Sequence, residues 1–307
     1  MKRLQNRIAT AGLTLPVASA CTLAVWVLAG LFTHGLWPQL ACFVAAVYML
    51  IELSNGNALL RVRSRMVSTV FMFLSCSTCF LFPSLSGAVV QMCYVAAMLL
   101  LFTTYQNAQA AGRVFYASAF IGLSSMVWVQ SLCLTPVLWV LMGSQLQSLS
   151  WRTLAASVIG LIAPYWIALL FLLWQQDFTP LTEHFTQLAK WPFPPDCSAL
   201  TISHIAALAL VVLLLAVSTV HFWTHSFEDK IRTRLLYGLL TVLSAVVLIW
   251  LVLQPQHYDV LMRLLLLFAS PLIAHYFTLT NSRLTNIVFI TSTLVSVAIT
   301  AYNLWTA

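Results

Sequence analysis

A short group of titratable residues near position 260 combines the residue types that recognise phosphate. Asp259 and Arg263 are four positions apart, so on a helix they lie on one face and can form an ion pair, and His257 precedes them closely. Guanidinium groups bind phosphate and diphosphate oxygens well. The group therefore predicts a pocket in which His257, Asp259 and Arg263 are candidate catalytic residues, and in which Arg263 also binds the substrate.

A hydrophilic stretch between residues 175 and 199 carries side chains that could complete that pocket. Glu183, His184 and Asp196 are its candidate substrate-binding residues, and Asp177 adds a further carboxylate. A plainer interpretation stays open, in which Asp259 and Arg263 form a structural ion pair and the charges of the stretch are merely solvated.

One carboxylate, Glu52, stands inside the apolar run of residues 47–53. Eight helical residues separate it from Leu60, a rise of about 12 Å, which places it inside the hydrocarbon region of a bilayer. A charge at that depth costs about 2.5–3.5 kcal/mol or more, so we expect Glu52 to face the bundle interior, with a partner or protonated. His275 has a comparable depth in another apolar run and is a possible partner for Glu52, and both residues are candidates for catalysis or proton relay.

Structural explanations of Glu52 and His275 also stay open. A helix that ends at Leu53 would leave Glu52 near the lipid headgroups, and the polar residues 54–57 could break the helix there. A single histidine in a membrane helix often serves only as an interhelical hydrogen-bonding group.

Two groups of residues have spacings that metals or redox reactions use. His221, His225 and Glu228 fall on one helical face, which would suit part of a metal site, but charged residues follow at once and favour a plain interfacial turn. Cys76 and Cys79 have the spacing of a zinc or redox pair, but their surroundings are apolar and offer no second ligand pair, which favours buried thiols. We therefore expect no metal and no cofactor.

The composition defines the setting in which these residues must be placed. Of the 307 residues, 61% are hydrophobic and 7% are charged, against about 25% charged residues in ordinary soluble domains. These values exclude a water-soluble fold. The chain has no phosphate-binding glycine loop, no dinucleotide-binding turn, no nucleophile elbow and no basic strip with stacking aromatics, so ATP hydrolysis, hydride transfer and nucleic-acid binding lack support.

Long apolar runs without alternation predict membrane-spanning helices, because backbone groups in lipid must be bonded internally. We expect about eleven spans in one all-α integral membrane domain over residues 1–307, with no soluble domain. The fifth and sixth spans share a stretch that breaks near Thr135 and Pro136, so they are expected to be short or re-entrant, and nine is the lower count. The expected spans are residues 9–33, 37–58, 66–83, 88–106, 114–130, 132–147, 153–174, 199–223, 235–253, 259–279 and 284–305.

Basic residues give the expected orientation, because Lys and Arg favour the cytoplasmic side of a membrane. With the N-terminus inside, 12 of the 14 Lys and Arg residues fall in inner segments. Lys190 is then the basic residue of the outer side, and Arg263 lies within the tenth span. The longest loop, about 175–199, is outer and is expected to pack on the membrane surface.

The first residues imitate a secretory signal peptide, with basic residues before an apolar stretch and small residues at 18–20. The apolar stretch continues to Phe32, which is too long for the core of a cleaved signal, so we expect an uncleaved first helix.

Several short motifs between Arg113 and Tyr165 resemble uncharacterised families of bacterial inner-membrane proteins. They are residues 122–125 (Gly-Leu-Ser-Ser), 135–136 (Thr-Pro), 150–152 (Ser-Trp-Arg) and 160–165 (Gly-Leu-Ile-Ala-Pro-Tyr). The stretch is also distantly similar to multi-span glycosyltransferases and polysaccharide polymerases that use lipid-linked sugars. Those enzymes place an acidic catalytic residue in the first outer loop, whereas residues 33–39 contain none. The resemblance thus implies a lipid-linked substrate without the usual catalytic base.

Three classes of function fit these observations. The first is a role in assembling envelope glycans or lipid-linked saccharides in the bacterial inner membrane. The second is a proton-coupled transporter or flippase, and the third is a non-catalytic scaffold that binds membrane partner proteins. The expected partners are the bilayer, a lipid-linked substrate or such proteins, and not nucleic acid.

Overall fold

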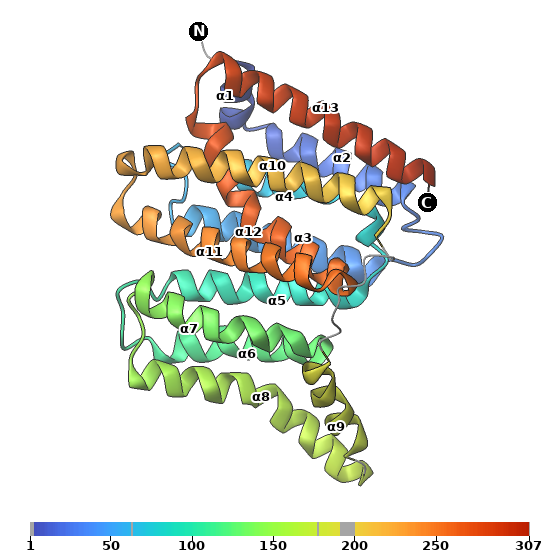
Figure 1. The fold of residues 1–307 in the computed structure, drawn as a ribbon, viewed down its shortest axis with the longest axis vertical. Coiled ribbons are helices and arrows are strands. Elements are labelled where there is room, and N and C mark those ends of the chain that lie inside the picture. The colour runs from blue at the N-terminus through green and yellow to red at the C-terminus, as the bar shows by residue number, and fades with distance from the viewer. Residues whose placement is uncertain (1–2, 63, 177, 191–199, 307) are drawn as a thin grey trace.

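The computed structural model describes residues 3–62, 64–176, 178–190 and 200–306, and within these ranges it contains helices and no strand. The long helices lie side by side in a stack, with α13 and α2 at one side and α8 at the other (Figure 1). The α-helices are α1 (Leu4–Thr10), α2 (Thr14–Leu28), α3 (Trp37–Gly56), α4 (Met66–Ser77), α5 (Leu85–Phe102), α6 (Ala111–Val127), α7 (Thr135–Ser144), α8 (Trp151–Gln175), α9 (Thr179–Thr186), α10 (Ile202–His225), α11 (Ile231–Leu253), α12 (Tyr258–Leu279) and α13 (Arg283–Thr306). The 3-10 helices are η1 (Cys79–Leu81), η2 (Val129–Leu134), η3 (Gln187–Ala189), η4 (Ser226–Glu228) and η5 (Pro255–His257).

Length and composition identify a multi-pass membrane protein. Among the described residues, 7 helices are long and apolar enough to cross a bilayer, or up to 8 if the bent pair α1 and α2 is one span. The helices α4, α6 and the segment Val129–Ser144 are apolar but shorter. The expected count of eleven is therefore not reached by length, although each expected span coincides with helical structure.

The first expected span is not one helix. The chain bends by 92° between α1 and α2, at residues 11–13. Gly12 lies at the bend, and Pro16 in the first turn of α2 has no N–H with which to continue a helix from α1. The expectation of a single helix over residues 9–33 was wrong because these local breakers act within an apolar run.

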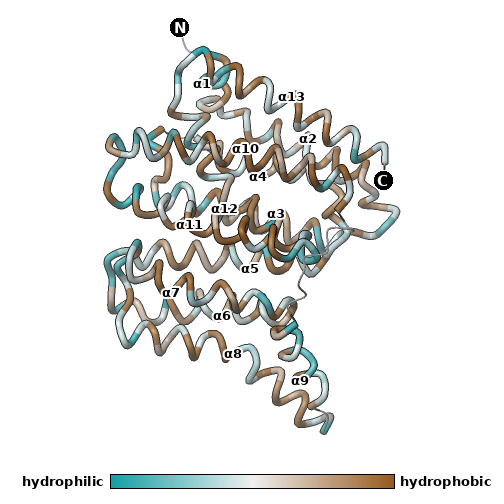
Figure 2. Tube along the Cα trace, viewed as in Figure 1, coloured by the Kyte–Doolittle hydropathy of each residue, from teal (hydrophilic) through white to brown (hydrophobic). Residues whose placement is uncertain are grey.

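Helix α12 occupies the centre of the bundle. It contacts α4, α5, α10 and α11, and every residue from Val260 to Thr278 is buried. Hydrophobic residues run along the helices while hydrophilic residues gather at the connections (Figure 2). A helix that is apolar all round and enclosed by other helices must satisfy each of its few polar side chains within the protein.

Hydrogen bonds show which connections meet at each end of the stack. We call one end the Arg61 end; it contains α1 and residues 57–62, 64–65, 103–110, 145–150, 226–231 and 280–282. Bonds there include Gln5 Nε2 to the Thr280 carbonyl at 2.6 Å and Arg232 to Asn57 Oδ1 at 2.7 Å. We call the opposite end the Arg263 end; it contains α9 and residues 78–84, 128–134, 201–204 and 254–263, where the Arg263 guanidinium bonds to the Ser84 carbonyl.

The described basic residues other than Lys190 and Arg263 lie at the Arg61 end or within its adjoining helical turns, and Lys2 and Arg63 fall outside the described residues. The structure thus agrees with the expected segregation of basic residues to one end of the bundle.

Small residues allow α6 and α8 to pack closely. A Cβ added at Gly122 would lie 2.5 Å from the Leu161 carbonyl oxygen, and one added at Gly160 would meet the Phe115 carbonyl directly. Between them, the hydroxyls of Ser118 and Ser157 bond at 2.8 Å. This small-residue packing is typical of membrane helix pairs.

We expect Gly160→Ala to lower the free energy of unfolding by about 1–3 kcal/mol, because the new methyl group must push two helix backbones apart. The matched control is Gly112→Ala in α6, where nothing lies within 4 Å of an added Cβ. Thermal unfolding in detergent should show a lower midpoint for Gly160→Ala and no loss for Gly112→Ala. Equal midpoints for the two variants would contradict the close packing of α6 and α8.

Candidate functional site

A buried pair of titratable residues joins α12 to the connection between α10 and α11. His275 Nε2 lies 3.0 Å from Asp229 Oδ2, and each side chain is 1% exposed. Because a carboxylate only accepts hydrogen bonds, the geometry places a hydrogen on Nε2 of His275. The pair is a candidate site for proton exchange, since ionisable groups within membrane bundles are often functional.

Arg61 connects the pair to the surface at the Arg61 end. Its Nε bonds to Asp229 Oδ1 at 2.6 Å, and its NH1 bonds to Glu228 at 2.9 Å. The hydrogen bond to Asp229 is the main cause of a raised pKa for the Arg61 guanidinium, which therefore stays charged. Asp229 thus accepts hydrogen bonds on both of its oxygens.

Aromatic rings enclose the His275 side of the pair. The Tyr237 and Phe222 rings lie edge-on to the imidazole, at 4.8 and 5.6 Å between centroids, and the Tyr237 hydroxyl donates to the Leu59 carbonyl. The His221 ring lies 6.4 Å from the His275 ring. Nδ1 of His275 and Nδ1 of His221 are both buried without a hydrogen-bond partner among the described residues.

Glu52 does not meet His275. It lies on an exposed face of α3, one turn before the helix ends at Gly56, and no described residue forms an ion pair with it. The expectation that Glu52 faces the bundle interior was wrong. Helix rotation, which the apolar run around Glu52 did not specify, turns it outward, and Asp229 takes the place beside His275.

The suggested metal groups do not assemble. Among the described residues no cluster of three or more His, Cys, Asp or Glu side chains could hold a metal ion. The His221 and His225 rings stack at 4.4 Å, but Glu228 is turned to Arg61. Cys76 and Cys79 are buried as free thiols.

At the Arg263 end, the expected ion pair forms, but Arg263 is enclosed. Its Nε lies 3.3 Å from Asp259 Oδ1, its NH2 donates to the Leu81 and Ser84 carbonyls, and its side chain is 5% exposed. The nearby His257 accepts a hydrogen bond of 3.4 Å from the Trp128 indole. This arrangement favours the structural interpretation, because the guanidinium ties α12 to the start of α5.

The stretch expected to be a loop over residues 175–199 instead contains α9 and η3. His184 on α9 bonds to the Ser125 carbonyl at 2.9 Å, while Glu183 is exposed. Asp177 and Asp196 lie outside the described residues. No described bond joins His184 or Glu183 to Arg263, so the structure does not bring these candidates into one pocket.

An apolar groove of about 340 Å³ lies between η2, α8 and α9, beside His184. Its walls include Leu161, Leu169, Leu181 and Phe185. The Tyr165 hydroxyl at its margin bonds to the Ser125 hydroxyl at 2.7 Å and lies 3.5 Å from His184 Nε2. The groove thus combines apolar walls with one polar margin.

Asp229 is the residue that sequence reasoning missed, since it was counted only among the charges of an interfacial turn. A usable signal existed. Three acidic residues, Glu52, Glu228 and Asp229, belong to the end of the spans near His275. The last two shortly precede the apolar run 235–253, which forms a hairpin with the run that contains His275. Hairpin proximity would have favoured them over Glu52.

The helices and their polar clusters define an all-α, multi-pass membrane bundle. No known family, no curated protein and no solved structure matches the chain.

We expect Asp229→Ala to lower the free energy of unfolding by about 3 kcal/mol, because it leaves His275 without its partner in the interior. Glu228→Ala is the matched control: its side chain is 45% exposed, and an exposed ion pair contributes about 0–1 kcal/mol. Thermal unfolding in detergent measures both. Similar losses in the two variants would show that the His275 contact contributes nothing beyond a surface ion pair.

Proposed function

We propose that this chain is a bacterial inner-membrane protein whose Arg61 end is cytoplasmic. The positive-inside tendency supports the orientation, since the basic residues gather at that end. We further propose that α4, α6 and α7, despite their length, complete about eleven crossings. The connections before and after each of these helices lie at opposite ends of the bundle, as crossings require.

Within that membrane protein, we propose that the groove beside α9 binds the hydrocarbon chain of a lipid-linked saccharide during envelope glycan assembly. The observation that carries this proposal is an apolar groove of about 340 Å³ on the lipid-facing side of α8. Ile162 and Trp166, two α8 residues that line the groove, are 46% and 62% exposed, so the groove opens on the outer surface of the bundle. A groove open to lipid favours a lipid chain as its occupant.

The polar margin determines at which end of the groove the polar head of the lipid can bind. His184, Tyr165 and Ser125 form a small hydrogen-bonded group at one side, to which the phosphate or sugar of such a lipid can bind. The Arg263 end, where this margin lies, is the outer end in the proposed orientation.

The resemblance of residues 113–165 to proteins that use lipid-linked sugars supports the same substrate class. That stretch includes η2 and the first half of α8, which supply Leu132, Leu161, Ile162 and Tyr165 to the lining of the groove. No acid and base of the described residues face each other across the groove, so the function we propose is binding and presentation of the substrate.

Photo-crosslinking with a polyprenyl diphosphate probe tests the groove. We expect Leu169→Trp to reduce labelling of the purified protein about tenfold, because the indole fills the space of the lipid chain. Ile167→Trp is the matched control, since it adds the same ring to an exposed position of the same helix outside the groove.

Equal labelling of both variants and the wild type would count decisively against lipid binding in the groove. A second outcome is that Leu169→Trp lowers labelling and Ile167→Trp does not, but deletion of the protein leaves the envelope glycans of the source cells unchanged. The groove then binds lipid without the proposed role in glycan assembly.

A second candidate function is proton-coupled flipping of such a lipid, and the buried pair of Asp229 and His275 favours it. The measurement is the movement of a fluorescent polyprenyl phosphate between leaflets of reconstituted vesicles, with and without a pH gradient. We expect the gradient to accelerate the wild type and Glu228→Gln, but not Asp229→Asn, because Asn cannot accept the proton. The same rate with and without a gradient in the wild type would exclude proton coupling.

A further inference from the structure

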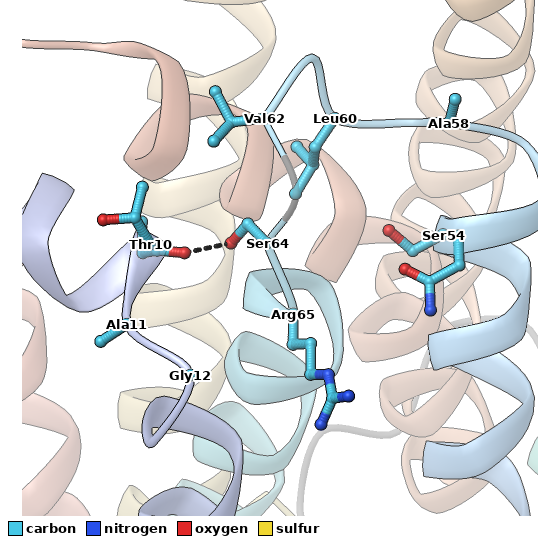
Figure 3. A pocket seen from close by; sticks show the side chains of 11 residues that line it. Thr10, Ala11, Gly12, Ser54, Ala58, Leu60, Val62, Ser64 and Arg65 are labelled. Atoms are coloured by element: carbon cyan, nitrogen blue, oxygen red, sulfur yellow. Dashed lines mark hydrogen bonds between the residues drawn. The ribbon is translucent and has the colours of Figure 1, made fainter.

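A cavity of about 680 Å³ lies at the Arg61 end, far from the groove beside α9. Three segments form its walls: the turn between α1 and α2, the last turn of α3, and the connection that leads into α4 (Figure 3). Its polar side chains are Thr10, Ser54, Asn55, Ser64 and Arg65.

Two of these side chains have hydrogen-bonding capacity that no described residue takes up. Ser54 is 6% exposed, and its hydroxyl makes no hydrogen bond within the described part of the chain. Arg65 forms no ion pair with any described residue, and its side chain reaches into the space between Gly12 and α3 (Figure 3). By contrast, the Ser64 hydroxyl is occupied, because it donates to the Ala9 carbonyl. A buried serine hydroxyl and an exposed guanidinium, both without a partner among the described residues, fit an anionic ligand.

The charges around the cavity favour an anion. Among the described residues that line the cavity, Arg65 is charged and none is a carboxylate. Glu228 and Asp229 in the neighbouring connection are paired with Arg61, and Glu52 is exposed outside the lining. Arg65 is also the N-cap of α4, so the positive end of that helix dipole lies at the cavity edge.

The position of α1 sets the depth of the cavity in the membrane. Because α1 makes an angle of 92° with α2, it runs along the membrane surface when α2 spans the bilayer. The cavity adjoins the turn between them, so in the orientation proposed above, on which this step rests, it lies at the cytoplasmic surface of the membrane. Basic pockets between membrane helices at the cytoplasmic surface bind anionic headgroups.

We propose that this cavity holds the phosphate of an anionic phospholipid headgroup. Arg65 pairs with the phosphate oxygens, and Ser54 donates a hydrogen bond to one of them. The bound lipid connects the α1–α2 turn to the end of α3, two parts of the chain that border the same cavity.

The test uses the full chain in phosphatidylcholine bilayers that contain spin-labelled phosphatidylglycerol, with electron spin resonance measuring the immobilised lipid. We expect the wild type to prefer phosphatidylglycerol to spin-labelled phosphatidylcholine, and Arg65→Gln to lose about tenfold in relative affinity, the worth of one charge-assisted hydrogen bond. Ser54→Ala should lose affinity in the same direction but less. The matched control is Arg7→Gln, which removes the same charge from an exposed residue of α1 outside the lining.

Equal losses in Arg65→Gln and Arg7→Gln would overturn the proposal in favour of diffuse surface charge. If Arg65→Gln does not fold, as judged by circular dichroism, Ser54→Ala decides the outcome. Inorganic phosphate distinguishes the source of the ligand: a preference for phosphatidylglycerol that persists in excess phosphate supports a lipid, and its complete displacement by phosphate overturns the lipid assignment.

Discussion

The enclosure of α12 is the constraint on which the rest of the structure depends. A helix without an exposed face must find partners for every polar side chain inside the protein, since unpaired polar groups in an apolar interior are costly. Arg263 and His275 sit near opposite ends of α12, and each finds a carboxylate there, Asp259 and Asp229. Arg263 also binds backbone carbonyls before α5. These contacts fix the position of α12 against the connections at both ends of the bundle.

Features with a local cause could be predicted from the sequence. Apolar runs located the helices, and the four-residue spacing of Asp259 and Arg263 predicted their ion pair. The break expected near Thr135 and Pro136 coincides with the start of α7. The crossing of the bilayer by the short helices α4 and α6 and the orientation stay predictions. The bend between α1 and α2 was missed because hydropathy averages over a window, whereas one glycine and one proline act at single positions.

Features that depend on helix rotation could not be predicted. Glu52 and Ser54 are two residues apart on α3, yet Glu52 is exposed and Ser54 is buried at a cavity. An almost uniformly apolar helix has little periodicity from which to infer its buried face. The unknown rotation of the helices also concealed the partner of His275. Depth in the membrane limits the possible acidic partners of His275 to three residues, but it does not show which of them faces the imidazole.

The enclosed centre of the bundle also bears on where the proposed substrate can bind. A path through the middle would require α12 to move. That movement would separate Arg263 from the Leu81 and Ser84 carbonyls and would break the buried pair of His275 and Asp229, which costs about 3–5 kcal/mol. The groove beside α9 and the cavity near Arg65 lie instead on the perimeter, where they are reached from the bilayer without opening the core. A lipid is the class of ligand that arrives by that route. The same enclosure that makes α12 rigid therefore favours lipid chemistry at the two ends over passage of a soluble substrate through the bundle.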